Sequence, residues 1–258
     1  MQRLVTRVAP PSLLLNEFSL AVNGLKRAHD GLRIAHLSDL HVGWATSSSR
    51  ICEALAMVRS SAPDLVIMTG DYICLSKLDV PPMKEALRGL ADIPTLATLG
   101  NHDFWAGPER VAGALRDIGI DVMRNEHRSI RIRGEELWVV GVDDPVTEAD
   151  DVALAFQGIP DHVEVPLVLA HCGRAAQEIA AYGAGLILSG HTHGGQVQIS
   201  TVTDSLGKRM GIPYMRGLHE LGDTKLYVTP GVGNSAIPFR AGQGAHPEVA
   251  VITLRCHS

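Results

Sequence analysis

The chain has 258 residues, of which 45% are hydrophobic and 20% charged, so its composition is globular and its length supports a large core. The formal net charge is −5, the opposite of the basic excess that nucleic-acid-binding proteins usually carry. No run approaches the ~20 apolar residues that cross a bilayer, and the first residues lack the apolar stretch of a secretory signal. We therefore expect a cytoplasmic protein that does not bind nucleic acid, and leave open peripheral contact with the inner face of the membrane.

Over the first 190 residues, short apolar segments alternate with segments that have the periodicity of amphipathic helices. Strands are predicted over 13–25, 33–38, 65–69, 94–99, 166–170 and 186–189, and helices over 47–60, 81–91, 107–118 and 173–181. Residues 120–143 are expected to form antiparallel strands around the turn Arg133-Gly134-Glu135. Thr147 and Asp150 resemble a capping box for a short helix that ends at Phe156.

From residue 194 onward the pattern changes to strands and turns. Strands are predicted over 196–199, 225–229 and 248–254. Strands that alternate with helices, followed by strand-rich pairing, indicate an α/β fold with two packed mixed sheets and helices outside. A single domain over residues 1–258 is expected, because the side chains described next are spread along most of the chain.

Five of the predicted strands end in side chains that can bind a metal ion. The segments are Asp39-Leu40-His41, Gly70-Asp71, Gly100-Asn101-His102-Asp103, His171 and Gly190-His191-Thr192-His193. The carboxyl ends of strands in an open α/β sheet meet at one crevice, so these segments are expected to converge. The candidate ligands are Asp39, His41, Asp71, Asn101, His171, His191 and His193.

The composition of this set indicates which metals it suits. Imidazole, carboxylate and amide ligands without thiolate favour Mn, Fe, Zn, Ni or Co over a soft metal. Seven ligands exceed what a tetrahedral zinc needs, so we predict two divalent ions that share one bridging carboxylate. In an extended segment, Asp39 and His41 point the same way and hold one ion together. His191 and His193 have the same spacing, but a turn there would aim them at different ions.

Charge counting suggests the substrate. The positive charge of two divalent ions is offset in part by the carboxylates Asp39 and Asp71 and by a bridging hydroxide. One net positive charge remains, and it suits a singly charged phosphodiester better than a neutral ester or amide. His102 is then not needed as a ligand. Since imidazole is the usual proton-transfer group near neutral pH in enzymes, His102 is the candidate proton donor to the leaving oxygen. Asp103 is a candidate partner for the other ring nitrogen of His102.

The remaining candidates carry weaker signals. The other histidines are interpreted as structural: His29, His36, His127, His162, His219, His246 and His257. Four cysteines show no CxxC spacing and are predicted to be free thiols, and Cys172, next to a candidate ligand, is interpreted as a packed side chain. Gly231-Val232-Gly233-Asn234 is interpreted as a tight turn near the site. The loop 72–76 is equally compatible with the substrate cleft and with the core.

These residues resemble the calcineurin-like metallophosphoesterase superfamily, whose blocks DxH, GD, GNHD or GNHE, H and GHxH all occur here in order. The bacterial YkuE/YaeI-like branch is more similar still. That resemblance rests on four stretches, 31–41, Gly194-Gly195-Gln196, 226–233 and 236–240. Two departures are Cys172-Gly173, where this branch often has Asn-Pro, and the missing membrane anchor or export signal of some relatives.

The resemblance implies a four-layer αββα sandwich and metal-dependent hydrolysis of phosphate esters. It implies that one ion is held by Asp39, His41, Asp71 and His193. It implies that the other is held by Asp71, Asn101, His171 and His191. Asp71 then bridges the two ions, and His102 matches the catalytic histidine.

Three functions are carried forward. The first is a binuclear phosphodiesterase, with Mn as the favoured metal and possibly accompanying monoesterase activity, that acts on a small-molecule or lipid-linked substrate through a bridging hydroxide and His102. The second is a pyrophosphatase for a nucleotide-sugar lipid such as UDP-2,3-diacylglucosamine. The third is a non-catalytic scaffold, which is disfavoured because neither a ligand nor His102 is lost. Substrate-binding residues, the native metal and the oligomeric state stay open.

Overall fold

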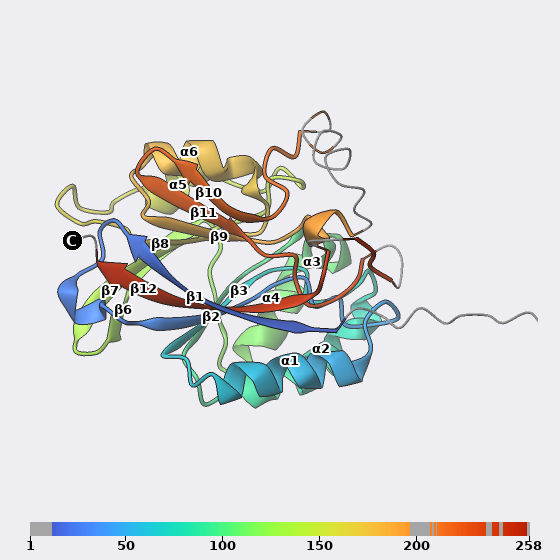
Figure 1. Cartoon of the computed structure of the whole chain (residues 1–258). Helices are drawn as coiled ribbons and strands as arrows, with labels where there is room; N and C mark the ends of the chain where they lie inside the picture. Colours follow the sequence, from blue (N-terminus) through green and yellow to red (C-terminus); the bar gives the residue numbers. More distant parts are fainter. Residues whose placement is uncertain are drawn as a thin grey trace, which may run out of the picture.

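The protein consists of two β-sheets packed face to face, with helices on both outer faces (Figure 1). The computed structural model describes residues 12–196, 207, 209, 211–235, 239–242 and 245–256. This arrangement is the predicted four-layer αββα sandwich. Within the described ranges, no helix combines the length and the apolar character needed to cross a bilayer.

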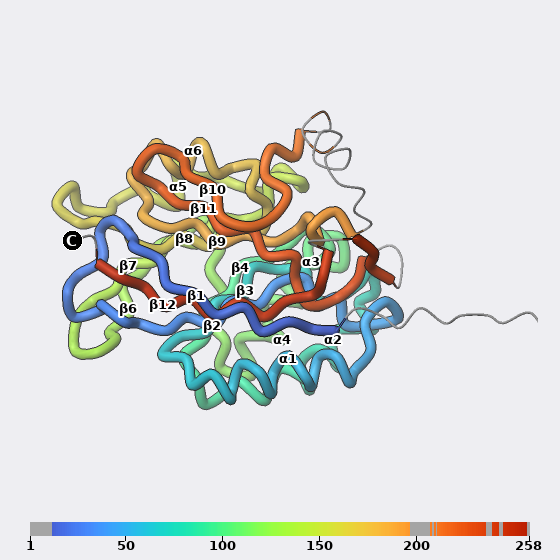
Figure 2. Tube along the Cα trace, viewed as in Figure 1, coloured from blue at the N-terminus to red at the C-terminus, as the bar shows by residue number. Residues whose placement is uncertain are grey.

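The first sheet has the strand order β1-β12-β2-β3-β4-β5. Its strands are β1 Leu14–Val22, β12 Glu248–Cys256, β2 Arg33–Leu37, β3 Leu65–Thr69, β4 Thr95–Thr98 and β5 Asp121–Val122. Strands β2 to β5 run parallel, whereas β12 pairs antiparallel with β2 and parallel with β1. Figure 2 shows β1 and β12, from opposite ends of the chain, side by side.

The second sheet has the order β10-β11-β9-β8-β7-β6. Its strands are β10 Gly217–Leu221, β11 Thr224–Val228, β9 Leu186–Ser189, β8 Leu167–Ala170, β7 Glu135–Val142 and β6 Glu126–Ile132. The four inner strands run parallel, and each edge strand is antiparallel to its neighbour. The carboxyl ends of the parallel strands therefore meet at one edge of each sheet.

Three helices pack on the outer face of the first sheet, and two shorter ones pack on the second. They are α1 Ser48–Ser60, α2 Val80–Leu87 and α4 Pro108–Arg116, and then α5 Val152–Phe156 and α6 Ala176–Ala181. A further helix, α3 Asn101–Ala106, follows β4 directly, and short 3₁₀ turns are η1 Arg27–His29, η2 Lys77–Asp79, η3 Arg88–Leu90, η4 Gly173–Ala175 and η5 His193–Gly195.

Alternating strand residues face two different apolar layers. In β3, Leu65 and Ile67 pack between the two sheets, whereas Val66 and Met68 pack against the helices. All four are fully buried, since both faces of this central strand are covered. Burial of each such side chain stabilises the folded state by roughly 1.5–3 kcal/mol. Because the strand interiors are apolar, polar functional side chains are found at the strand ends.

Most predicted elements are present, two predictions about local structure are wrong, and strand β10 was not predicted. Residues 121–122 were expected in an antiparallel pair, but β5 lies parallel to β4 because α4 returns the chain to the same edge of the first sheet. The capping box of Thr147 and Asp150 is wrong: Thr147 forms a turn with Asp144, and the Asp151 side chain accepts the Leu154 N–H to start α5. Helix α3 was not predicted.

One predicted strand, 196–199, lies outside the described residues except for Gln196, and so do Ala236, Ile237 and Pro238 of the stretch that ends at Arg240. The four cysteines are free thiols, as predicted. Cys172 is buried, and this burial raises the pKa of its thiol, which agrees with a packed side chain.

Candidate metal centre

Five parallel strands deliver their next residues to one place between the two sheets. Strands β2, β3, β4, β8 and β9 end one to four residues before the predicted ligands. The structure brings all seven predicted ligand side chains together, and six of them are buried: Asp39, His41, Asp71, Asn101, His171 and His193. His191 is partly buried.

The backbone at these positions differs from the prediction. Asp39 and His41 were expected on an extended segment, but their φ angles are 54° and 45°, in the left-handed region. The reason lies in the neighbouring strand exit. The Asp39 N–H donates to the Gly70 carbonyl and the His41 N–H to the Asp71 carbonyl, each at 3.0 Å. The segments that follow β2 and β3 are therefore hydrogen-bonded to each other. Asp71, His191 and His193 have positive φ as well, at 56°, 71° and 51°.

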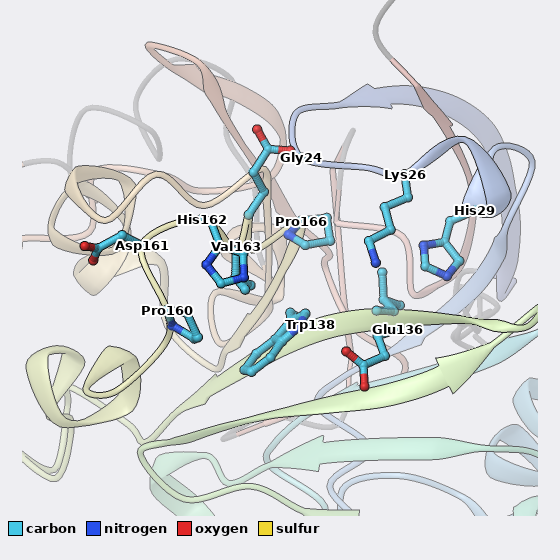
Figure 3. Close-up of a pocket in the computed structure, with 12 residues that line it drawn as sticks. Gly24, Lys26, His29, Glu136, Trp138, Pro160, Asp161, His162, Val163 and Pro166 are labelled. Atoms are coloured by element: carbon cyan, nitrogen blue, oxygen red, sulfur yellow. The ribbon is translucent and has the colours of Figure 1, made fainter.

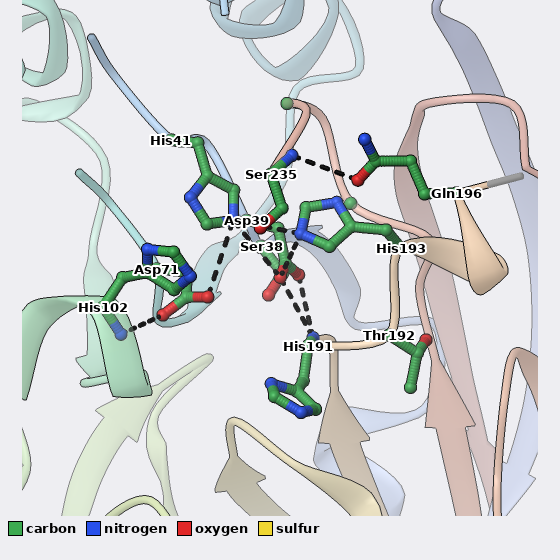
Figure 4. A network of polar contacts seen from close by, with 12 residues as sticks. Ser38, Asp39, His41, Asp71, His102, His191, Thr192, His193, Gln196 and Ser235 are labelled. Carbon is green, nitrogen blue, oxygen red and sulfur yellow. Dashed lines mark hydrogen bonds and ion pairs between the residues drawn. The ribbon is translucent and has the colours of Figure 1, made fainter. Parts of the chain in front are cut away.

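The first group of ligand atoms consists of Asp39, His41 and His193 (Figure 4). The Nε2 atoms of His41 and His193 lie 3.0 Å apart. The Asp39 Oδ1 atom lies 3.4 Å from His193 Nε2 and 4.0 Å from His41 Nε2. Two imidazole nitrogens and one carboxylate oxygen therefore converge on one point.

The second group consists of Asn101, His171 and His191. The Asn101 Oδ1 atom lies 3.2 Å from His171 Nε2 and 2.9 Å from His191 Nδ1. The two imidazole nitrogens are 3.3 Å apart. On its far side, His171 Nδ1 contacts the Thr69 carbonyl at 2.6 Å, which fixes a proton on Nδ1 and turns Nε2 toward the group.

Asp71 lies between the two groups. Its Oδ2 atom is 3.5 Å from His41 Nε2 and 3.3 Å from His171 Nε2, while its Oδ1 accepts the backbone N–H of His102 at 2.9 Å. One carboxylate oxygen is thus shared between two sets of nitrogen and oxygen donors. Imidazole nitrogens and carboxylate or amide oxygens are all metal ligands. Their close approach to one another fits two bound cations better than direct hydrogen bonds between them.

His102 lies beside both groups. Its ring centroid is 4.6 Å from that of His41 and 5.0 Å from the Trp105 ring, and its Nδ1 contacts the Cys74 carbonyl. One nitrogen of His102 also lies within 4.8 Å of ligand atoms of His41 and Asp71, so geometry alone permits it to join a metal.

The predicted contact between Asp103 and His102 is wrong. Because α3 begins at Asn101, Asp103 is in its first turn, and its side chain accepts the N–H of Gly100 at 2.9 Å. The same carboxylate accepts the N–H groups of Asp71 and Tyr72 at 2.8 and 3.0 Å. Asp103 therefore ties the end of β3 to the end of β4.

The electrostatics favour uncharged rings at His41, His191 and His193, whereas Asp71 is firmly ionised and its charge raises the pKa of His171 well above the usual value, against the effect of burial. Burial lowers the pKa of His41 to about 3 and that of His191 to about 4, so both rings keep a lone pair at neutral pH. Burial raises the pKa of Asp39 to about 6. Burial also acts to raise the pKa of Asp71, but the charge of His171 and its hydrogen bond outweigh this and hold that pKa below its usual range.

Sequence reasoning missed Arg240, which packs behind His193. The buried Arg240 donates to His193 Nδ1 at 2.9 Å and to the Pro230 carbonyl at 2.7 Å. The only signal in the sequence was that Arg240 ends a stretch used for the family resemblance. The turn predicted near the site is present: a Cβ atom at Gly231 would lie 2.6 Å from the Asp39 Cβ, so only glycine permits this approach.

A separate cavity contains none of the predicted ligands. It has a volume of about 510 Å³ and is lined by Lys26, His29, Trp138, His162 and neighbours (Figure 3). Since it includes residues near the start of β7 and just before β8, it lies at the amino ends of the strands, opposite the candidate centre. Cavity size therefore does not identify the site here.

Three relatives show a similarity that extends along most of the chain. A membrane-associated relative from Danio rerio, the transmembrane protein with metallophosphoesterase domain, is 31% identical over 98% of this chain, which spans 59% of that protein. The uncharacterized metallophosphoesterase YkuE of Bacillus subtilis is 28% identical, with 95% of this chain and 87% of YkuE covered. The phosphodiesterase YaeI of Escherichia coli is 29% identical, with 86% and 82% covered.

The family model described as calcineurin-like phosphoesterase matches residues 32–195, more than half of the chain. This range contains every one of the seven candidate ligands and His102. The chain therefore belongs to the calcineurin-like phosphoesterase family, which makes it a metal-dependent hydrolase of phosphoric esters.

Proposed function

We propose that the protein is a binuclear phosphodiesterase. The observation that carries this proposal is the position of Asp71, whose Oδ2 lies 3.5 Å from a nitrogen of one donor group and 3.3 Å from a nitrogen of the other. Asp39, His41, Asp71 and His193 would hold one ion, and Asp71, Asn101, His171 and His191 the other. When bound, two divalent ions polarise phosphoryl oxygens and lower the pKa of an attacking water.

The chain's own residues supply the remaining chemistry. Asp71 fixes the spacing of the two donor groups, and its second oxygen holds the backbone of His102 at 2.9 Å. His102 Nδ1 faces the Cys74 carbonyl and can only donate to it, so a proton carried on Nε2 would be the one passed to the departing oxygen. The net charge argument supports a diester, since one surplus positive charge matches one substrate negative charge.

The test is hydrolysis of bis(p-nitrophenyl) phosphate by protein loaded with Mn, Fe, Zn, Ni or Co. We expect p-nitrophenolate release with at least one metal, Mn foremost, and a lower rate with the monoester p-nitrophenyl phosphate. Faster hydrolysis of the monoester would overturn the diester assignment. Failure with all five metals would overturn the enzyme assignment and favour a scaffold.

A second candidate rests on one relative. The UDP-2,3-diacylglucosamine pyrophosphatase LpxG of Chlamydia trachomatis is 24% identical, with 81% of this chain and 80% of that protein covered. Pyrophosphate cleavage would use the same ligand set, because it too displaces an oxygen at phosphorus. Release of UMP from the diacylated nucleotide sugar, at a kcat/KM above that for a simple diester, would favour this candidate.

Two further features belong to the proposal. The whole chain, residues 1–258, would form one domain around this centre. The substrate would be a small molecule, free or attached to a lipid, and not a nucleic acid.

A further inference from the structure

Several exposed large apolar side chains lie on the segments that carry the candidate ligands or contact those segments. We name five of them the apolar rim: Trp44, Leu75, Leu78, Trp105 and Phe239. Each is between 52% and 78% exposed. Single exposed apolar residues are normal on a protein surface, but several grouped around a site mark a surface that contacts another apolar group.

The rim residues follow the candidate ligands closely in sequence. Trp44 comes three residues after His41, Leu75 four residues after Asp71, and Trp105 four residues after Asn101. The segments that position the ligands thus also position the rim. Phe239 precedes Arg240, the residue that packs behind His193, and its carbonyl accepts from the Gln196 side chain at 3.3 Å.

Two of the rim residues lie near His102. The Trp105 ring lies 5.0 Å from the His102 ring. The Trp44 side chain is close to the Cys74 thiol, and the Cys74 carbonyl contacts His102 Nδ1. The turn η2 that carries Leu78 packs on the Trp44 segment, since a Cβ atom at Gly43 would lie 2.8 Å from the Asp79 carboxylate. A phosphodiester bound beside His102 would therefore have the Trp105 side chain next to it.

We propose that the rim binds a hydrocarbon chain of the substrate, so that the protein acts on amphiphilic phosphodiesters. This inference rests on the proposed phosphodiesterase function and names its substrate class. Two of the five rim side chains are aliphatic and are exposed at 57% and 78%, which suits a hydrocarbon chain better than a nucleobase. A nucleobase would use the flat faces of the two tryptophans alone.

The test uses p-nitrophenyl phosphodiesters whose second ester is methyl, butyl or octyl, each below its critical micelle concentration. Water attacks phosphorus, the bond from phosphorus to the nitrophenyl oxygen breaks, and the products are p-nitrophenol and the alkyl phosphate. With Mn-loaded wild-type protein, we expect kcat/KM to rise at least about tenfold from the methyl to the octyl ester, because each added methylene leaves water on binding.

Rim variants and matched controls locate the effect. Leu75→Ser with Leu78→Ser, and separately Trp44→Ser, should lower the octyl-to-methyl ratio by at least about threefold. Leu154→Ser and Tyr182→Ser are the controls, because these side chains are 50% and 46% exposed but lie on or next to α5 and α6, away from the rim. The controls should leave the ratio unchanged.

The outcomes separate the rim from the hydrolase. Equal kcat/KM for all three esters, or equal loss in the control variants, would overturn the inference and leave the phosphodiesterase standing. Preference for a nucleoside p-nitrophenyl phosphodiester, sensitive to Trp44→Ser and not to the leucine changes, would replace the hydrocarbon with a nucleobase.

A binding measurement covers the case in which no diester is hydrolysed. Titration of the Mn-loaded protein with octylphosphonate should shift tryptophan fluorescence to the blue at concentrations where methylphosphonate has no effect. The same response to both phosphonates, or no response to either, would overturn the inference without any turnover being needed.

Discussion

The two donor groups of the candidate centre differ in what lies behind them. In the second group, His171 Nδ1 contacts the Thr69 carbonyl, so a ring proton is on the far side from the group. In the first group, His193 Nδ1 contacts the Arg240 guanidinium, which can only donate, so the ring proton lies on Nε2, the atom that faces Asp39 and His41. The second group therefore has a neutral carbonyl oxygen behind it, whereas a buried, permanently charged guanidinium lies behind the first and opposes a cation there. Two positions that share Asp71 should differ in metal affinity.

The most damaging change removes the residue common to both groups. Asp71→Asn takes away the shared charge between His41 and His171, so both ions should be lost and kcat/KM for a diester should fall at least about 10³-fold, equivalent to about 4 kcal/mol. Metal content by mass spectrometry and steady-state kinetics measure the two effects. The exposed Asp161→Asn is the control, and an Asp71→Asn protein that retains two ions would contradict a shared carboxylate.

His102 lies outside both groups, and its removal should affect chemistry alone. His102→Ala should lower kcat by about 10²- to 10⁴-fold, because the leaving oxygen loses its proton donor. Two ions should still bind, as measured by metal content after gel filtration. Loss of one ion in this variant would instead make His102 a ligand, as its position near His41 and Asp71 permits.

The two donor groups keep their relative positions only if the ends of β3 and β4 are held together. Asp103 accepts three backbone N–H groups from the ends of β3 and β4. An asparagine there places an NH₂ group against one of those donors, so Asp103→Asn should lower the free energy of unfolding by about 1–3 kcal/mol. Urea denaturation of metal-free protein measures this, with Asp161→Asn expected to stay within about 0.5 kcal/mol of wild type.

The smallest expected effect is the difference between the two positions themselves. Titration with Mn, monitored by electron paramagnetic resonance, should resolve two binding steps whose dissociation constants differ at least about tenfold. Residues that hydrogen-bond to a metal ligand typically change metal affinity by that much. His171→Ala should remove the tighter step and His193→Ala the weaker one. The reverse assignment would mean that Arg240 assists the first position.

The sequence alone predicts the strands well because buried strands are continuous apolar runs, and β3 and β9 begin and end where predicted. The seven ligands could be predicted because polar side chains directly after such runs have few structural reasons to be there. The hairpin of β6 and β7 was likewise visible in its Arg133-Gly134 turn.

The local geometry at the strand exits could not be predicted in the same way. Asp39 and His41 adopt left-handed φ angles because backbone groups from the β3 exit bind theirs, and no period in the sequence reports a contact between distant segments. Arg240 was missed for the same reason, since it reaches His193 across 47 residues. Asp103 was assigned to a neighbouring ring because its role as a helix cap depends on α3, which was not expected.

The position of β12 has a consequence for synthesis on the ribosome. This strand, Glu248–Cys256, separates β1 from β2, so β1 has no permanent neighbour in its sheet until β12, far later in the chain, has been made. Residues 14–22 therefore stay without their native strand partner while the rest of the sandwich assembles. A nascent chain stalled before residue 248 would therefore expose an apolar strand edge, and it is at this stage that a chaperone would be needed most.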